Sequence, residues 1–331
     1  MKLDTVAHCD SGSTDLRSGL RRIRRMKTLL ALTFAVLAAA PAAVAGGGPQ
    51  YAAVGGPGVA SPNGKLHYVA IAAAPGRTTL VTVAADGSVW NWPSFRGSLG
   101  IPMIGYQTPV GISRDGRRLF LQSLSVNAPT DFLVVDLRSM RAVDRFTLRG
   151  AFSFDALSPD GSKLYLTDRV DPSNDPSRYV VRAYDLETHT LLPGRIADAT
   201  QKRWVMQGEA VTRAISPGGR WVYTLYSSPG GTPFIHALDT VKGVAHCTGI
   251  PWASPDQGAL WNVVLGVHGS HLAVHWRSGK AWYDLDTATW RLSPAHGSGF
   301  PWPWLGLAAL PGLLFLLWRR RPEGTLLPRQ A

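Results

Sequence analysis

The feature that most constrains the fold is a repeat of about fifty residues through the middle of the chain. A short turn rich in Ser, Pro, Asp and Gly occurs at residues 61–64, 113–116, 158–161, 216–219 and, in a degenerate form, 266–269. A strand-like run follows each turn, and a later run ends at an aspartate: Asp86, Asp136, Asp185, Asp239 and Asp284. Because two independent markers share one period, we predict five similar structural units.

Each unit is predicted to contain four β-strands. In the third unit they cover residues 152–157, 163–167, 179–186 and 190–196, which are rich in β-branched and aromatic residues. The Asp-Gly pair between the first two strands favours a hairpin, because glycine adopts a positive φ without steric cost. Four-stranded sheets at this spacing are typical of propeller blades. The predicted fold class is therefore all-β, a β-propeller of about five four-stranded blades over residues 46–295.

Two segments of the third unit carry a family resemblance. The run LSPDGSKLYLT at residues 157–167, followed by VRAYDLET at residues 181–188, resembles the repeat of the bacterial YVTN and TolB-like β-propellers, which are related to WD-repeat proteins. The resemblance covers about residues 50–295 and is clearest in the second, third and fourth units. It implies a propeller fold, and it implies very little about the ligand.

Residues 1–45 are predicted to be an N-terminal extension and a signal peptide. Four arginines lie within residues 21–25, an apolar run covers residues 29–40, and Ala43-Val44-Ala45 precedes Gly46. A basic region, a short apolar region and an A-x-A site are typical of secretory signals. Export of the chain from residue 46 is expected, and translation could start at Met1 or at Met26.

Residues 300–318 are predicted to form a transmembrane helix. These 19 residues carry no charge and are followed by three arginines at residues 319–321. At a rise of ~1.5 Å per residue the segment spans about 28 Å, close to the thickness of a bilayer core. The positive-inside rule leaves the basic tail, residues 319–331, in the cytoplasm and the propeller outside the cell membrane. A sortase-like protease could instead remove the tail.

The charge of the chain reflects these terminal segments. The full sequence has 34 basic and 22 acidic residues, but residues 46–300 keep only 23 and 18 of them. The remaining basic residues are scattered, which argues against a nucleic-acid partner. Cys9 lies in the segment expected to be lost, so Cys247 cannot close an internal disulfide in the exported domain.

The obvious candidates for chemistry have structural explanations. The repeated aspartates end strands, where hydrogen bonding of the carboxylate to the following backbone is expected. His268, His271 and His275 could suggest zinc, but only His271 and His275 would share a strand face, and further ligands cannot be placed. No G-x-S-x-G segment occurs. We therefore predict no catalytic residue, no metal and no cofactor.

The strands that precede the turns are expected to line the axis of the propeller. The position three residues before each turn is occupied by Gly58, Val110, Asp155, Arg213 and Val263, and the position one residue before it by Ala60, Ile112, Leu157, Ile215 and Leu265. Asp155 and Arg213 are opposite charges at one register, so they are predicted to lie in contact. The pair is either a structural bridge or, with Glu209 and Asn262, a polar channel lining that binds a ligand.

Two functions remain open from the sequence. The first is a binding or scaffolding module at the cell surface, anchored through the C-terminal helix, whose partner is a protein, a glycan or another envelope component. The alternative is a propeller-type hydrolase or lactonase with its site at the mouth of the axial channel.

Overall fold

The computed structural model describes residues 52–125, 129–198, 200, 205–228, 230–254 and 256–295. The chain divides into two compact units, residues 1–261 and residues 262–331. Each unit is described by itself below. The predicted signal segment, transmembrane helix and basic tail lie outside the described residues.

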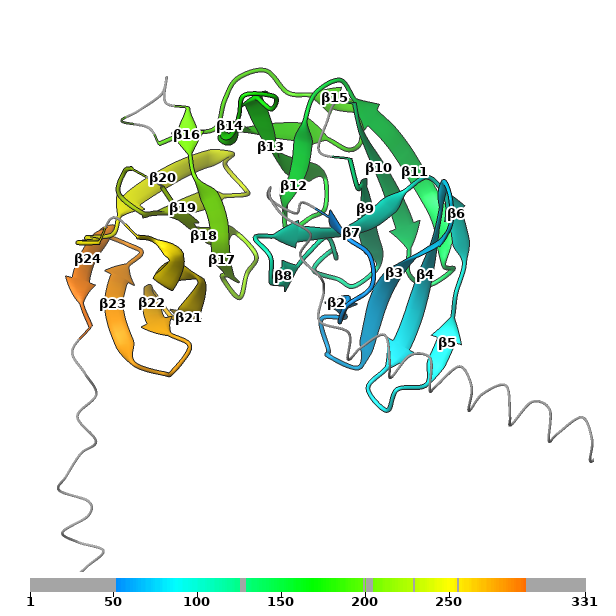
Figure 1. The fold of residues 1–331 in the computed structure, drawn as a ribbon, viewed down its shortest axis with the longest axis horizontal. Coiled ribbons are helices and arrows are strands. Elements are labelled where there is room, and N and C mark those ends of the chain that lie inside the picture. The colour runs from blue at the N-terminus through cyan, green and yellow to red at the C-terminus, as the bar shows by residue number, and fades with distance from the viewer. Residues whose placement is uncertain are drawn as a thin grey trace, which may run out of the picture. The chain divides into compact units, whose positions relative to one another are not determined.

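The first unit contains four antiparallel sheets (Figure 1). Sheet 1 consists of β2 (Val59–Ala60), β3 (Leu66–Ala74), β4 (Arg77–Ala84), β5 (Val89–Asn91) and β6 (Ser94–Arg96). Sheet 2 consists of β1 (Ala52–Ala53), β7 (Leu99–Ile104), β8 (Thr108–Pro109), β9 (Arg118–Ser123), β10 (Thr130–Asp136) and β11 (Arg141–Leu148). Sheet 3 consists of β12 (Phe152–Leu157), β13 (Lys163–Asp171), β14 (Asp175–Asp185), β15 (Thr190–Leu191) and β16 (Met206–Gln207). Sheet 4 consists of β17 (Glu209–Ile215), β18 (Trp221–Ser227), β19 (Phe234–Asp239) and β20 (Val244–Gly249).

The second unit contains one sheet. A 3-10 helix, η1 (Gly258–Asn262), leads into β21 (Val263–His268), β22 (His271–Trp276), β23 (Ala281–Asp286) and β24 (Arg291–Pro294), which form sheet 5. All five sheets are built on four strands paired in chain order, and sheets 1 to 3 carry short additional strands. The predicted all-β fold with five four-stranded, blade-type units is confirmed.

Local turn chemistry explains why the chain reverses at the Ser-containing turns of sheets 1 to 3. In sheet 3, the Ser158 hydroxyl donates to the Asp160 carboxylate and accepts a hydrogen bond from Lys163 N, 2.9 Å away. Gly161, which directly follows Asp160, has a φ of 71°, a conformation that favours glycine. The same pattern of bonds recurs at Ser61 and Ser113. These contacts join residues at most five apart in the sequence, so the chain reversal needs no distant partner.

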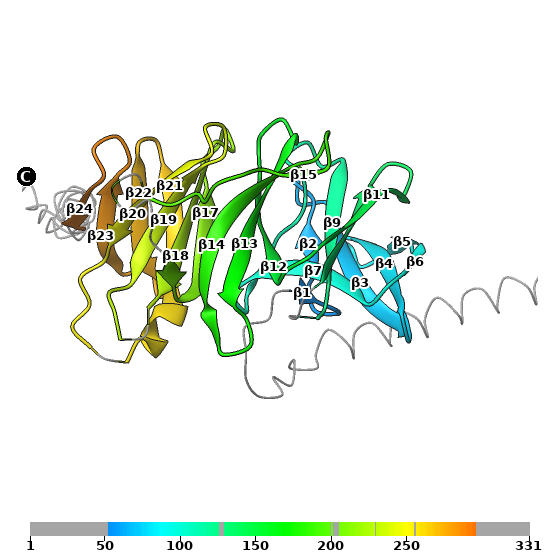
Figure 2. The ribbon, with the colours of Figure 1, turned by 90° about the horizontal axis from the view of Figure 1, so that it is seen from above.

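The sheets of the first unit pack face to face in chain order (Figure 2). Three apolar clusters join sheets 1 and 2 (among others Leu80 and Leu121), sheets 2 and 3 (Phe132 and Leu164) and sheets 3 and 4 (Tyr165 and Leu238). Burial of each such side chain contributes roughly 1.5–3 kcal/mol. This packing of successive four-stranded sheets is the arrangement of propeller blades.

Two predictions for the fifth repeat, the position of its turn and the identity of its aspartate, are wrong. Residues 266–268 belong to β21, and the turn lies between the paired residues His268 and His271, not at residues 266–269. The aspartate that accepts the turn hydrogen bonds is Asp286, which binds the backbone N–H groups of residues 288 and 289, so Asp284 was the wrong choice. The turn between β21 and β22, Gly269-Ser270, lacks the Ser-x-x-Gly pattern of the other four turns, and cross-strand pairing sets its register instead.

In the part of the chain that the structure describes, no helix has the length and apolar character needed to cross a bilayer.

Candidate functional site

The predicted contact between Asp155 and Arg213 is present. The Arg213 guanidinium donates through Nη2 to Asp155 Oδ1 and through Nη1 to the Asp155 backbone oxygen, and its Nε donates to Thr224 Oγ1 at 2.9 Å. The side chains are only 3% and 2% exposed. Each charge is therefore matched where water cannot solvate it, which is the condition for keeping an ion pair inside a protein.

Shifts in strand register turn the Asp155 and Arg213 side chains toward each other. The register between β12 and β13 shifts between Phe154 and Ala156, so Asp155 is the extra residue of a bulge. A similar shift between Ala210 and Thr212 precedes Arg213 in β17. Bulges commonly redirect a side chain out of the regular alternation of a strand. They explain how charged groups on two separate sheets meet.

A cavity of about 630 Å³ lies beside this pair, entirely within the first unit. Its lining includes the residues that directly precede the four Ser-containing turns, namely Ala60, Ile112, Leu157 and Ile215. Ile215 is 54% exposed, an unusual state for a large apolar side chain at the end of an inner strand. The positions predicted one residue before each turn thus line one cavity and give it an apolar wall, although Ile112 of sheet 2 lies outside the strands and makes only an isolated bridge to Leu119.

The turns themselves lie at one end of the cavity. Pro62, Arg114, Pro159 and Pro217 belong to its lining, and the Arg114 guanidinium donates to the carbonyl oxygen of Gly218, across from sheet 2 to sheet 4. The turn residues that recur from repeat to repeat therefore form this end of the cavity, and the apolar side chains before each turn form its wall.

The two other predicted channel residues lie elsewhere. Glu209, the first residue of β17, lines a separate small cavity of about 50 Å³ together with Asp155, Arg169 and Tyr106. Asn262 belongs to the second unit, where its carbonyl oxygen accepts a hydrogen bond from Arg277 N at 2.6 Å. Within the first unit, the structure thus brings Asp155 together with Arg213 and, on the small cavity, with Glu209.

Sequence reasoning missed a buried histidine behind the ion pair. His236 lies in the middle of β19 and is 1% exposed, and its Nδ1 is 3.4 Å from the Cys247 sulfur. Burial lowers the pKa of His236 to about 4. Burial, with the nearby Asp198 carboxylate, raises the pKa of the Cys247 thiol to about 12. Both groups are neutral near pH 7, so this pair is not an activated nucleophile. The signal was available, because His236 interrupts an apolar strand.

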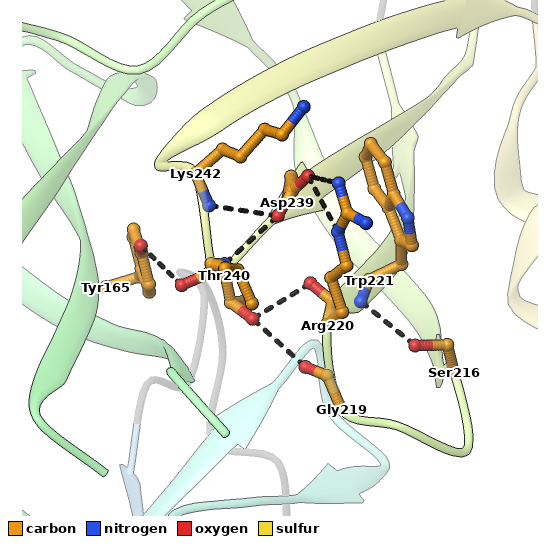
Figure 3. Close-up of polar contacts among 9 residues, drawn as sticks. Tyr165, Ser216, Gly219, Arg220, Trp221, Asp239, Thr240 and Lys242 are labelled. Atoms are coloured by element: carbon orange, nitrogen blue, oxygen red, sulfur yellow. Dashed lines mark hydrogen bonds and ion pairs between the residues drawn. The ribbon is translucent and has the colours of Figure 1, made fainter. Parts of the chain in front are cut away.

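Asp239 has the structural role predicted for the repeated aspartates (Figure 3). Its Oδ1 accepts hydrogen bonds from the backbone of Val241 and Lys242, each 3.0 Å away, and its Oδ2 is 2.6 Å from Arg220 Nη2. Burial alone would raise its pKa, but the bonds from Arg220 and the backbone outweigh burial and hold the pKa below its ordinary value. The next residue, Thr240, links the sheets, since its carbonyl oxygen accepts a bond from Tyr165 of sheet 3 at 2.8 Å.

Asp86, Asp136 and Asp185 bind the backbone of their own turns in the same way. The repeated aspartates of the first unit thus anchor turns, as predicted from their positions at the ends of strands.

Two of the histidines of sheet 5 have individual partners. His271 Nδ1 is 2.9 Å from Asp284 Oδ1, and His275 Nδ1 is 3.2 Å from the Trp276 carbonyl oxygen. Over residues 52–295, apart from the short gaps in that range, no three His, Cys, Asp or Glu side chains are grouped as a metal site requires.

Comparison with known proteins gives structural matches only. No family model and no curated protein matches the sequence. Among solved structures, TolB from Acinetobacter baumannii is 14% identical, with 72% of this chain and 53% of that chain covered and a TM-score of 0.38. The Dos1 propeller is 11% identical, with 72% and 58% covered and a TM-score of 0.43. A putative 6-phosphogluconolactonase from Bacteroides uniformis is 16% identical, with 76% and 70% covered and a TM-score of 0.42. This chain thus spans little more than half the length of the first two, and its blade assignment rests on its own strand topology.

Proposed function

We propose that the chain is a binding or scaffolding module whose ligand inserts an apolar group into the cavity of the first unit. The observation that carries this proposal is the composition of the inner strands. Their exposed wall is apolar, and the two buried charges beside it, Asp155 and Arg213, are bound to each other. Pockets lined mainly by apolar side chains with a few polar groups are typical ligand sites.

A hydrolase remains the alternative function. In the described part of the first unit, its acidic groups would be Asp155 and Glu209, which line the small cavity. Asp155 is already held by Arg213, so it is poorly placed to exchange a proton with a substrate. We therefore favour binding over catalysis.

The cavity proposal can be tested with Ile215→Lys. Binding of the uncharged fluorescent probe Nile red should fall sharply, because a lysine at this position puts a charged amine against the apolar wall. Stability should change by only about 0.5 kcal/mol, because Ile215 is already half exposed. Fluorescence titration and thermal unfolding measure the two effects.

The matched control is Val241→Lys. Val241 is also 54% exposed, but it lies in the turn between β19 and β20 and does not line the cavity. The Val241→Lys variant should bind Nile red like the unmodified chain. Equal binding by both variants would contradict the assignment of the cavity.

We also propose that the module is exported and anchored in the cell membrane, with its C-terminus in the cytoplasm. The support comes from the signal-like residues 1–45 and the uncharged residues 300–318 before three arginines. Mass spectrometry of membrane fractions should find a mature chain that starts near Gly46. A soluble protein that still carries Met1 would exclude both export and anchoring.

A further inference from the structure

The outer edge of sheet 1 carries two tryptophans that the cavity does not use. Trp90 and Trp92 are 68% and 60% exposed, the highest values among the large apolar side chains of the described residues. They lie at β5 and directly after it, and β5 and β6 together form the outermost strand position of the sheet. Exposed aromatic side chains gathered on one edge are typical of an interaction surface.

Polar neighbours hold this surface in place. The indole Nε1 of Trp90 donates to Ser88 Oγ at 2.9 Å, and Ser88 Oγ donates to Asp86 Oδ1 at 2.6 Å. The hydroxyls of Ser94 and Thr79 are 2.6 Å apart and join β6 to β4. The indole of Trp90 is thus hydrogen-bonded to the turn before the strand.

The edge is a poor template for an added peptide strand. The register shift between β4 and β5 leaves Trp90 as the extra residue of a bulge. The N–H of Trp92 donates to Asn91 Oδ1 at 3.1 Å, and Pro93 has no N–H to offer. Bulges and proline on an edge prevent strand-to-strand pairing. A ligand at this surface must therefore be held by side chains and not by the backbone.

The charge of the surface favours a neutral ligand. Residues 87–95 contain no charged side chain, the flanking charges of Asp86 and Arg96 are opposite in sign, and Ser88, Asn91 and Ser94 lie among the aromatic residues. We propose that this edge is a second binding site, separate from the cavity, for a neutral glycan chain. The C–H faces of sugar rings would stack on the indoles of Trp90 and Trp92, and the sugar hydroxyls would bind the amide and hydroxyl side chains between them.

The test is affinity electrophoresis of the protein through native gels that contain dextran, laminarin, galactomannan or hydroxyethylcellulose. At least one of these neutral polysaccharides should retard the chain. Trp90→Ala and Trp92→Ala should each weaken the binding about tenfold, because each removes a large aromatic contact, and the double variant should migrate as in a plain gel. The melting temperatures should stay unchanged, because both side chains are mostly exposed.

Two controls separate this site from other effects. Val143→Ala changes a 55% exposed side chain on β11, the outer strand of sheet 2, and should be retarded like the unmodified chain. Ile215→Lys should also be retarded, so a failed cavity proposal leaves this result intact. The glycan site is wrong if none of the four polysaccharides retards the chain, if the double variant is retarded normally, or if neutral peptides bind the edge instead.

Discussion

Replacing Arg213 with alanine should destabilise the first unit by about 3–5 kcal/mol, because it leaves the buried Asp155 carboxylate without its cation. The variant also loses the bonds to the Asp155 backbone oxygen and to Thr224, which tie β12, β17 and β18 together. Urea denaturation followed by circular dichroism measures the loss. If Arg213 instead serves only a ligand, the variant will keep its stability and lose binding alone.

A comparison within sheet 4 makes this prediction sharper. Arg220 also pairs with a buried aspartate, Asp239, but the Arg220 side chain is 46% exposed. The Asp239 carboxylate keeps its two backbone hydrogen bonds when the arginine is removed. Arg220→Ala should therefore destabilise much less than Arg213→Ala. Equal losses for the two variants would show that burial of the pair is not the source of the effect.

Removing both charges provides a second check. The double variant Asp155→Ala, Arg213→Ala leaves a space but no unpaired charge in the interior. It should be more stable than Arg213→Ala alone, because the desolvated carboxylate is the main cost in the single variant. A double variant that is less stable than both single variants would contradict this interpretation.

The parts of the fold that the sequence predicted depend on short-range chemistry. A Ser-x-Asp-Gly turn contains its own hydrogen-bond partners, so the hairpin of sheet 3 is legible from residues 158–161 alone. The same turns set the register of the inner strands, which placed Asp155 and Arg213 at matching positions in neighbouring sheets. The prediction of their contact followed from counting back from two turns.

The parts that could not be predicted depend on pairing between distant segments. β1 pairs with β7, where Ala52 lies opposite Pro102, and no local signal marks this contact. In sheet 5, the turn between His268 and His271 is formed by Gly269 and Ser270 and lacks the Ser-x-x-Gly pattern of the other four turns, so the pairing of β21 with β22 fixes it. The bulge at Asp155 is likewise a result of pairing with β13. Where the local chemistry was missing, the predicted positions of the turn and of its aspartate were wrong by two residues.

The separation of Glu209 from the larger cavity has a related cause. Glu209 and Arg213 are four residues apart on β17, so regular alternation would place them on one face. The register shift between Ala210 and Thr212 lies between them and breaks the alternation. The Glu209 side chain, which was predicted to line the same channel as Arg213, therefore lines the small cavity instead.

The second large effect is an acid sensitivity that comes from His236. Burial lowers its pKa to about 4 in the folded chain, whereas a histidine in the unfolded chain has a pKa near ~6.5. The unfolded state therefore binds more protons between these two values, so the stability that neutral His236 contributes is complete above pH ~6.5 and is lost as the pH falls toward 4. Between pH 7 and pH 5 the loss should be about 2 kcal/mol.

The difference between the unmodified chain and His236→Gln isolates this contribution, since the carboxylates and the exposed histidines titrate in both proteins. Glutamine keeps a polar group near Cys247 Sγ without a titrating proton. Urea denaturation at pH 7, 6 and 5 should give a steeper fall in stability for the unmodified chain, by about 2 kcal/mol over this range. Parallel pH profiles for the two proteins would mean that His236 is not the buried neutral group behind the Asp155–Arg213 pair.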